Sequence, residues 1–225
     1  MKTLIPLCFL LLLSCEGQPH HGKMKVKEAT RDFNGDGRMD RISIWLTEGK
    51  RYDDSMQWAG MGEKYEGHFI LVVTIAGKRP VVMNLNRLFY PGRRKEPSMF
   101  FWDRPWEFHF ADYNNDGLLD FNLGQCAGTV ALEFRLFTVA RDGVVHVLPV
   151  EGRPNWFLSI NLHEHSTPTI QDTEKGFSKV VYVRRRGEYV RGEFEWNESH
   201  QAFQLVSWRQ AALENDDVIQ EALDD

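Results

Sequence analysis

The stretch DFNGDGRMD at residues 32–40 is followed directly by the apolar run RISIWL at residues 41–46. The same pattern returns as DYNNDGLLD at residues 112–120, which leads into FNLG at residues 121–124. Both nine-residue stretches fit D-x-N-x-D-G-x-x-D, and each precedes a short apolar run of the kind that forms strands. The repeat predicts that the chain contains two strand–loop–strand units.

The spacing of the oxygen-bearing side chains in this pattern suits a calcium ion. Ca²⁺ takes 6–8 hard oxygen ligands, and a tightly wound loop points the side chains at positions 1, 3 and 5 inward together. Position 6 is a glycine because the chain turns sharply there, the carbonyl of position 7 faces the ion, and the acid at position 9 closes the shell. The alternative is a plain Asn/Asp/Gly turn between strands, which these residues also favour. The predicted ligands are Asp32, Asn34, Asp36, Arg38 and Asp40 in the first loop and Asp112, Asn114, Asp116, Leu118 and Asp120 in the second.

The loops depart from the EF-hand and resemble another family. An EF-hand needs a bidentate acid at position 12, but this position is Ser43 in the first loop and Leu123 in the second. Strand–DxNxDGxxD–strand resembles the calcium loops of FG-GAP and VCBS repeats, which implies that the position-9 acid binds in place of that glutamate. The stretch from Asp112 to Glu151 is similar to single-domain bacterial VCBS-type lipoproteins. Some related periplasmic proteins are inhibitors of lysozymes or immunity proteins against cell-wall-degrading toxins.

The N-terminus has the pattern of an export signal. Lys2 precedes the apolar run Leu4 to Leu13, which is too short to span a bilayer and has the length of a signal-peptide core. The following LLSC, ending at Cys15, resembles the lipobox of bacterial lipoproteins; an ordinary signal peptide is the alternative. We therefore expect a lipoprotein signal peptide at 1–14, a lipidated Cys15 with a tether at 15–25, and one β-rich domain at 26–225. The protein would be exported and anchored by lipid to the bacterial cell membrane, on the periplasmic side or on the cell surface.

Strand-like runs dominate the rest of the chain and indicate a mainly β protein with antiparallel sheets. Turn residues at 77–80 and 141–143 predict hairpins between the flanking apolar runs, and residues 197–200 join two later strands. Only residues 210–223 have a helical pattern. We expect a partial propeller, a sandwich or a barrel, with calcium loops between strands and a short C-terminal helix.

Composition excludes several classes of protein. The 225 residues are 42% hydrophobic and 26% charged, which is typical of a folded chain rather than a disordered one. With 27 basic and 32 acidic residues the net charge is −5, which argues against a nucleic-acid partner. Removal of Cys8 and lipidation of Cys15 would leave Cys126 alone, so the domain would form no internal disulfide.

Catalytic motifs are scarce. The chain lacks G-x-S-x-G, H-E-x-x-H, a P-loop and G-x-G-x-x-G. His163 and His165 would form a zinc pair only if they lay on a strand and found a third ligand. Glycosidase acids could be chosen from Asp103, Glu107 and Glu133, although a chain with this many acids offers such choices by chance.

Two function classes remain open. The first is a calcium-binding envelope lipoprotein that acts as a non-enzymatic binding or inhibitory module, with no catalytic residues and with the membrane and an envelope protein or glycan as partners. The basic loop at 93–95, followed by the aromatic residues 100–102, would suit such a partner, or it is simply solvated charge. The second is a glycan- or peptidoglycan-directed envelope hydrolase that uses calcium structurally.

Overall fold

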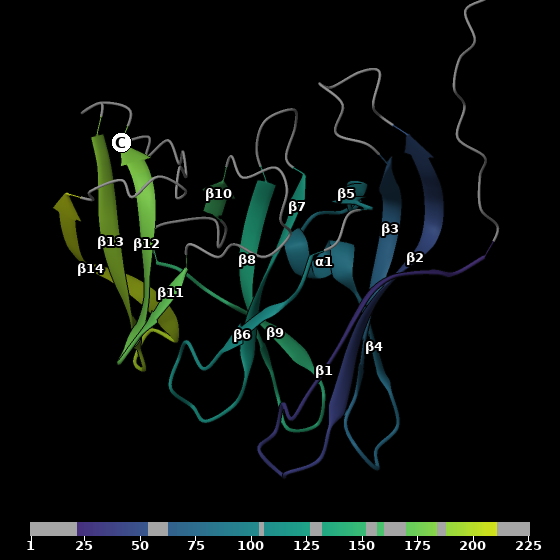
Figure 1. Ribbon diagram of the computed structural model, residues 1–225, viewed down its shortest axis with the longest axis horizontal. Helices are drawn as coiled ribbons and strands as arrows, with labels where there is room; N and C mark the ends of the chain where they lie inside the picture. The colour runs from purple at the N-terminus through teal and green to yellow at the C-terminus, as the bar shows by residue number, and fades with distance from the viewer. Residues whose placement is uncertain are drawn as a thin grey trace, which may run out of the picture.

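Three antiparallel β-sheets follow one another along the chain (Figure 1). The computed structural model describes residues 22–53, 63–103, 106–126, 132–151, 157–159, 170–183 and 188–210. The mainly β, antiparallel class expected from the sequence is confirmed. In the first sheet the strand order is β1-β2-β3-β4, and β5 pairs with the other end of β3. Its strands are β1 (Met24–Arg31), β2 (Asp40–Asp53), β3 (Glu63–Thr74), β4 (Val81–Asn84) and β5 (Met99–Trp102).

The second sheet repeats the plan of the first. Its strands β6, β7, β8 and β9 form a meander, and β10 pairs with the far end of β8 as β5 does with β3. The third sheet is a four-stranded meander in the order β11-β12-β13-β14. The bounds are β6 (His109–Ala111), β7 (Asp120–Cys126), β8 (Leu132–Val139), β9 (Val145–Leu148), β10 (Phe157–Ser159), β11 (Gln171–Thr173), β12 (Gly176–Val183), β13 (Glu188–Asn197) and β14 (Ala202–Gln210).

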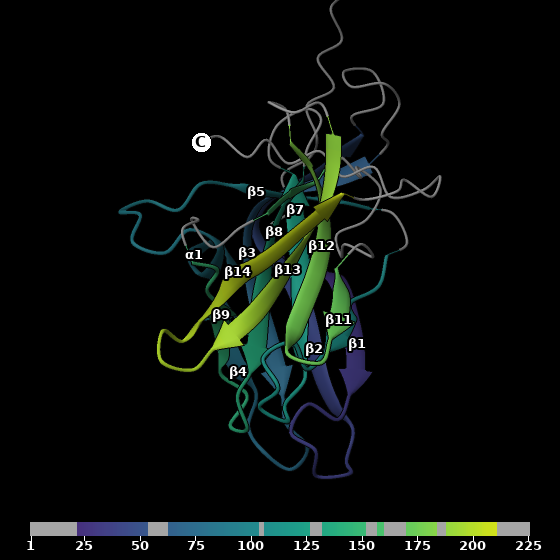
Figure 2. The same ribbon diagram turned by 90° about the vertical axis from the view of Figure 1, so that its left-hand side faces the viewer.

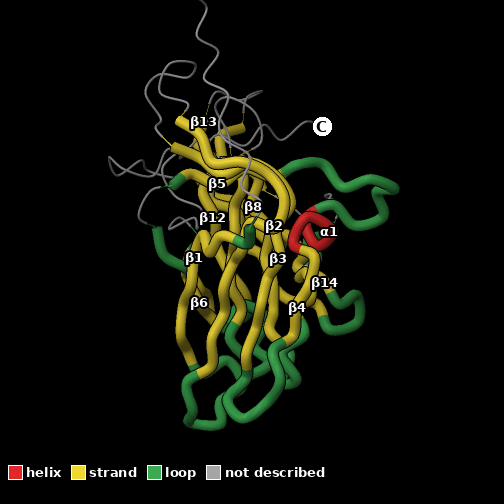
Figure 3. Tube along the Cα trace, turned by 90° about the vertical axis from the view of Figure 1, so that its right-hand side faces the viewer, coloured by secondary structure: helices red, strands yellow, loops and turns green. Residues whose placement is uncertain are grey.

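The sheets stack as three layers with the second sheet in the middle. Its Phe121, Leu123 and Phe137 pack in one core with the apolar face of the first sheet. Its Phe134 and Leu136 point to the opposite side and pack with Phe177 and other residues of the third sheet. Figure 2 shows the third sheet in front of the stack, and Figure 3 shows the first sheet from the other side. Because successive side chains of a strand point to opposite faces, a sheet in the middle of the stack needs apolar residues at consecutive positions, so that both of its faces can pack.

The hairpins agree with the sequence, but two elements differ from what it predicts. Strand β2 continues to Asp53, well beyond the expected Leu46. Its second half is mostly polar and more exposed, so the apolar pattern in the sequence ends before the strand does. A short helix, α1 (Leu85–Phe89), follows β4 where the sequence indicated only the end of a strand. The expected C-terminal helix falls almost entirely outside the described residues, and its first residue, Gln210, ends β14.

Helix α1 is fixed by two asparagines. Asn84 caps its start by accepting a hydrogen bond from the Arg87 N–H at 2.9 Å. Asn86 is fully buried: its amide donates to the carbonyls of Gly67 and Pro97, and its oxygen accepts from the Phe69 N–H. These bonds attach the helix to β3 (Figure 3).

Among the described residues no helix combines the length and the apolar character that crossing a membrane requires.

The β2–β3 pair contains a point of very close backbone approach. Gly49 and Gly67 face each other in the ladder with φ of 146° and 151°. A Cβ on Gly67 would lie 2.0 Å from the Glu48 carbonyl oxygen, and a Cβ on Gly49 would lie 2.0 Å from the Glu66 oxygen. Only glycine fits at either position, because the obstacle is backbone rather than a movable side chain.

We predict that Gly67→Ala destabilises the fold by at least about 2 kcal/mol more than Gly92→Ala, because the clash adds to the backbone strain. Gly92 is a matched control, since it also has a positive φ (80°) but has open space where its Cβ would go. Urea midpoints of the two variants measure the difference. Equal losses would show that backbone conformation alone, and not the close approach, requires glycine at this position.

Candidate metal centre

The two D-x-N-x-D-G-x-x-D stretches occupy equivalent places in the first two sheets. Loop 1 (residues 32–40) joins β1 to β2, and loop 2 (residues 112–120) joins β6 to β7. Both lie at the same end of the molecule, the lower end in Figure 1. They touch each other: the Leu119 N–H donates to the Phe33 carbonyl at 3.3 Å, and the Phe33 ring lies 5.3 Å from the Phe110 ring.

The hydrogen bonds inside the two loops follow the same pattern. The position-1 carboxylate accepts from the N–H groups of positions 5 and 6, which for Asp32 means Asp36 and Gly37. The matching bonds of Asp112 reach Asp116 and Gly117. In both loops the asparagine oxygen accepts from the position-5 N–H, and the position-5 carboxylate accepts from the position-7 N–H. Side chains 1, 3 and 5 therefore all turn toward the inside of their loop, as the spacing predicts.

Positive φ angles make this winding possible. Gly37 and Gly117 at position 6 have φ of 81° and 82°. Position 4 is also left-handed, with Gly35 at 70° and Asn115 at 58°. Asparagine is one of the few residues besides glycine that tolerates this region. The Asn115 amide also donates to the Glu174 carbonyl at 2.6 Å.

The position-9 aspartates are both buried but are bound differently. Asp40 is 1% exposed, and each of its oxygens accepts a backbone N–H: Oδ2 from Phe33 at 3.0 Å and Oδ1 from Ala76 at 2.7 Å. Asp120 is fully buried, and its Oδ2 accepts from both Tyr113 and Asn114. Its Oδ1 meets no hydrogen-bond donor. Loop 2 thus contains a buried, unpaired carboxylate oxygen that loop 1 does not have.

Electrostatics follow this difference. Burial, together with the neighbouring charge of Asp116, raises the pKa of Asp120 to about 7. The nearby Thr138 hydroxyl lowers this pKa in part, although it does not reach hydrogen-bond geometry. In loop 1 the Arg38 side chain donates to Asp36 and holds the pKa of that carboxyl at about 2. Asp120 is therefore the loop carboxylate with the greatest need of a proton or a cation.

The possible ligand atoms of loop 2 are all oxygens, the kind of ligand that calcium prefers. Each carboxylate oxygen has two lone pairs, so Asp112 and Asp116 keep acceptor capacity after binding the N–H groups of the loop. Asn114 and the Leu118 carbonyl add neutral oxygens, and Asp120 adds an unpaired one. Within the described ranges, no three His, Cys, Asp or Glu side chains are grouped as a metal cluster. Any ion would therefore have to rely on amide, main-chain and water oxygens together with the carboxylates.

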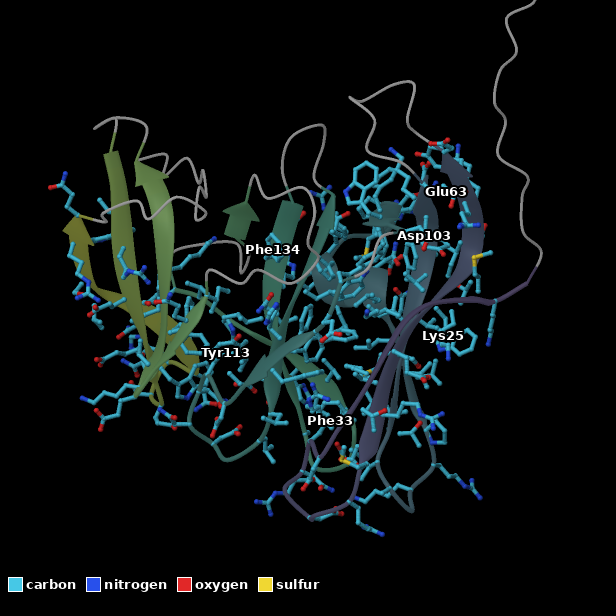
Figure 4. All side chains as sticks on the ribbon, viewed as in Figure 1. Lys25, Phe33, Glu63, Asp103, Tyr113 and Phe134 are labelled. Atoms are coloured by element: carbon cyan, nitrogen blue, oxygen red, sulfur yellow. The ribbon has the colours of Figure 1, made fainter. Side chains whose placement is uncertain are left out.

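The acids considered for glycoside hydrolysis are placed in separate surroundings. Asp103 forms an ion pair with Arg51, which also pairs with Glu63, at the end of the first sheet opposite the loops (Figure 4). Glu107 lines a groove of about 230 Å³ between β1 and the segment before β6. Glu133 lies in β8 of the middle sheet.

Glu133 belongs to a buried polar cluster that sequence reasoning missed. Its Oε2 accepts from the Tyr90 hydroxyl at 3.1 Å and from the Gln125 amide at 3.2 Å, and Oε1 lies 3.4 Å from the Arg135 guanidinium. Burial raises the pKa of Tyr90. The charges come from β8 and the hydroxyl from the end of α1, so no local pattern in the sequence could have joined them. The cluster holds the first two sheets together.

The predicted contact surface at the basic loop needs a correction. Arg93, Arg94 and Lys95 are exposed as expected. The aromatic part is not: Phe101 is fully buried and Trp102 is 5% exposed, because β5 pairs with β3 and turns these rings into the cores. Phe100 is half-buried. The surface here therefore consists of exposed cations beside the half-buried rings of Phe100 and Tyr90, and Phe101 and Trp102 do not contribute to it.

Several predicted positions lie outside the described residues. They are Cys15 with most of its tether, His163, His165 and residues 211–225. Cys126 ends β7. No protein-family model, curated protein or solved structure matches the chain.

We predict that Asp120→Asn and Asp40→Asn have opposite consequences in calcium-free buffer at pH 8. In Asp120→Asn the amide oxygen keeps the bonds from Tyr113 and Asn114 while the unpaired charge disappears, so stability stays equal or rises. In Asp40→Asn an NH₂ group must face a backbone N–H, which costs about 1–3 kcal/mol. Denaturant midpoints of the full chain in chelator measure both variants. A loss in Asp120→Asn as large as that in Asp40→Asn would show that Oδ1 of Asp120 is not unpaired.

Proposed function

We propose that this protein is a calcium-binding lipoprotein of the bacterial cell envelope that acts as a non-enzymatic binding or inhibitory module. The observation that carries the calcium part is the buried, unpaired Oδ1 of Asp120 beneath a loop whose other oxygens turn inward. A carboxylate held in this way costs free energy unless a cation or a proton compensates its charge. The ion would be held by Asp112, Asn114, Asp116, the Leu118 carbonyl and Asp120. Its role would be structural, because loop 2 begins the central strand β7.

The envelope part of the proposal rests on the sequence. The short apolar run that ends at Ser14 and Cys15 fits export and lipidation, and the net charge of −5 offers no general attraction to nucleic acid. The tether would leave the stacked sheets free to meet a partner.

The absence of an assigned reaction is supported by how the candidate acids are used. Asp103 is neutralised by Arg51, and Glu133 is bound by Arg135, Tyr90 and Gln125. The Glu133 cluster joins the first two sheets, and the Asp103–Arg51 pair lies within the first sheet. The exposed cations of residues 93–95 are the surface that we propose for an anionic region of an envelope protein or glycan.

We predict that calcium raises the melting temperature of the full chain in detergent. Extracellular modules bind calcium with dissociation constants of about 10⁻⁴–10⁻³ M. A tenfold excess of calcium over such a constant adds about 1.4 kcal/mol by linkage, which corresponds to about 3–6 °C. Asp116→Asn should remove most of this response. Calorimetric scans in calcium and in chelator are the test, with magnesium as the control ion. Identical scans in calcium and chelator would contradict calcium binding.

The anchor is tested separately by cell fractionation. Cys15→Ser should abolish labelling by a fatty-acid probe and move the protein from the membrane to the soluble fraction. If the protein is a binding module, the released protein should sediment with lipid-free envelope material when the two are mixed. The double variant Arg93→Glu, Arg94→Glu should sediment less. Membrane retention of Cys15→Ser together with an unlabelled wild type would rule out the lipobox. A released protein that never sediments would rule out the binding module.

A further inference from the structure

The two loops differ most at position 7. This position supplies a main-chain carbonyl to a bound ion, so its side chain is free to vary without loss of a ligand. It is Arg38 in loop 1 and Leu118 in loop 2. The consequence of this difference appears only in the structure.

Arg38 turns back onto the acidic centre of its own loop. Its Nε and one terminal nitrogen donate to Oδ2 of Asp36 at 3.3 and 2.9 Å. Asp36 is the position-5 ligand, so a positive charge lies directly on an oxygen that calcium would need. In both loops this oxygen also accepts from the neutral asparagine amide of position 3, at 3.2 Å in loop 1 and 3.1 Å in loop 2. Leu118 contributes no charge there.

The position-9 acids show the same asymmetry independently. Oδ1 of Asp40 is taken by the Ala76 N–H, which comes from the turn after β3. Oδ1 of Asp120 has no such donor and faces Thr138, its partner in the ladder. In loop 1 the position-5 carboxylate pairs with a cation, and both oxygens of the position-9 carboxylate accept backbone N–H groups. In loop 2 the position-5 carboxylate accepts from the neutral Asn114 amide, and one oxygen of the position-9 carboxylate has no donor in bonding geometry.

We infer that Arg38 is a built-in cation that takes the place of calcium in loop 1, so that the calcium requirement of the protein resides in loop 2. This inference rests on the proposed calcium binding and narrows it from two equivalent sites to one strong site. A unit positive charge about 6 Å from a divalent ion weakens its binding by about tenfold even in water. Displacing the guanidinium from Asp36 adds to that difference. Loop 1 binds calcium at least about tenfold more weakly than loop 2.

The experiment exchanges the two position-7 side chains in the full chain and measures calcium binding by isothermal titration calorimetry in detergent. The wild type binds one calcium ion per chain with the higher affinity. Asp116→Asn abolishes this binding, whereas Asp36→Asn does not. Arg38→Leu adds a second ion or tightens the weak site at least tenfold. Leu118→Arg weakens the tight site at least tenfold.

Two controls separate charge at position 7 from other effects. Arg79→Leu removes another exposed cation, from the segment between β3 and β4, and leaves the isotherm unchanged. Leu118→Ala removes the side chain without adding charge and keeps the tight site, which guards against misfolding as the cause of weaker binding in Leu118→Arg.

The outcomes distinguish this inference from the proposed function. Two ions of equal affinity in the wild type, or an unchanged isotherm in Arg38→Leu, would overturn the role of Arg38 while calcium binding stands. No binding by the wild type or by any variant would overturn both.

Discussion

A buried carboxylate stands at the first residue of the central strand in each of the first two sheets. Asp40 begins β2 and Asp120 begins β7, and each accepts the N–H of position 2 of its own loop. One side chain thus closes the loop and fixes where the strand starts. Because β2 and β7 pair on both sides, a shift at this point would move every ladder bond of the sheet and turn apolar faces outward. The cores on both sides of the middle sheet depend on these carboxylates staying buried.

The stacking of the sheets determines what that burial costs. Loop 2 belongs to the middle layer, and its Asn114 is 6% exposed, whereas Asn34 in loop 1 is half-buried. In the drier setting an unpaired oxygen is more costly, and a charge that compensates it is worth more. Two loops with one sequence pattern therefore have different chemistry, since one lies on the open side of the stack and the other under the third sheet.

The polar residues that looked most like catalytic groups hold the architecture together. Glu133, Arg135 and Tyr90 form a polar cluster between the first two sheets, and the partly exposed Arg51 joins Asp103 to Glu63 at the end of β2 and β3. The buried carboxylate of Glu133, which is bound inside the fold, is therefore not open to a substrate. Among the described residues, the cationic loop after α1 and the loop end of the stack are exposed to contact with other molecules.

The local features of this protein can be predicted from its sequence. The hairpins of β3–β4, β8–β9 and β13–β14 follow from turn residues between apolar runs, and the winding of both loops follows from Gly37, Gly117 and the spacing of the oxygens. These features depend on neighbours along the chain, so a local pattern contains them. The stacking order, the burial of Phe101 and Trp102, and the partners of the loop acids depend instead on contacts between distant parts of the chain. Asp40 and Asp120 have the same place in the sequence pattern, but the Ala76 N–H donates to Oδ1 of Asp40, whereas Oδ1 of Asp120 lies near the Thr138 hydroxyl without a hydrogen bond. That difference arises between strands far apart along the chain, where side-chain and backbone groups meet only after the sheets have formed.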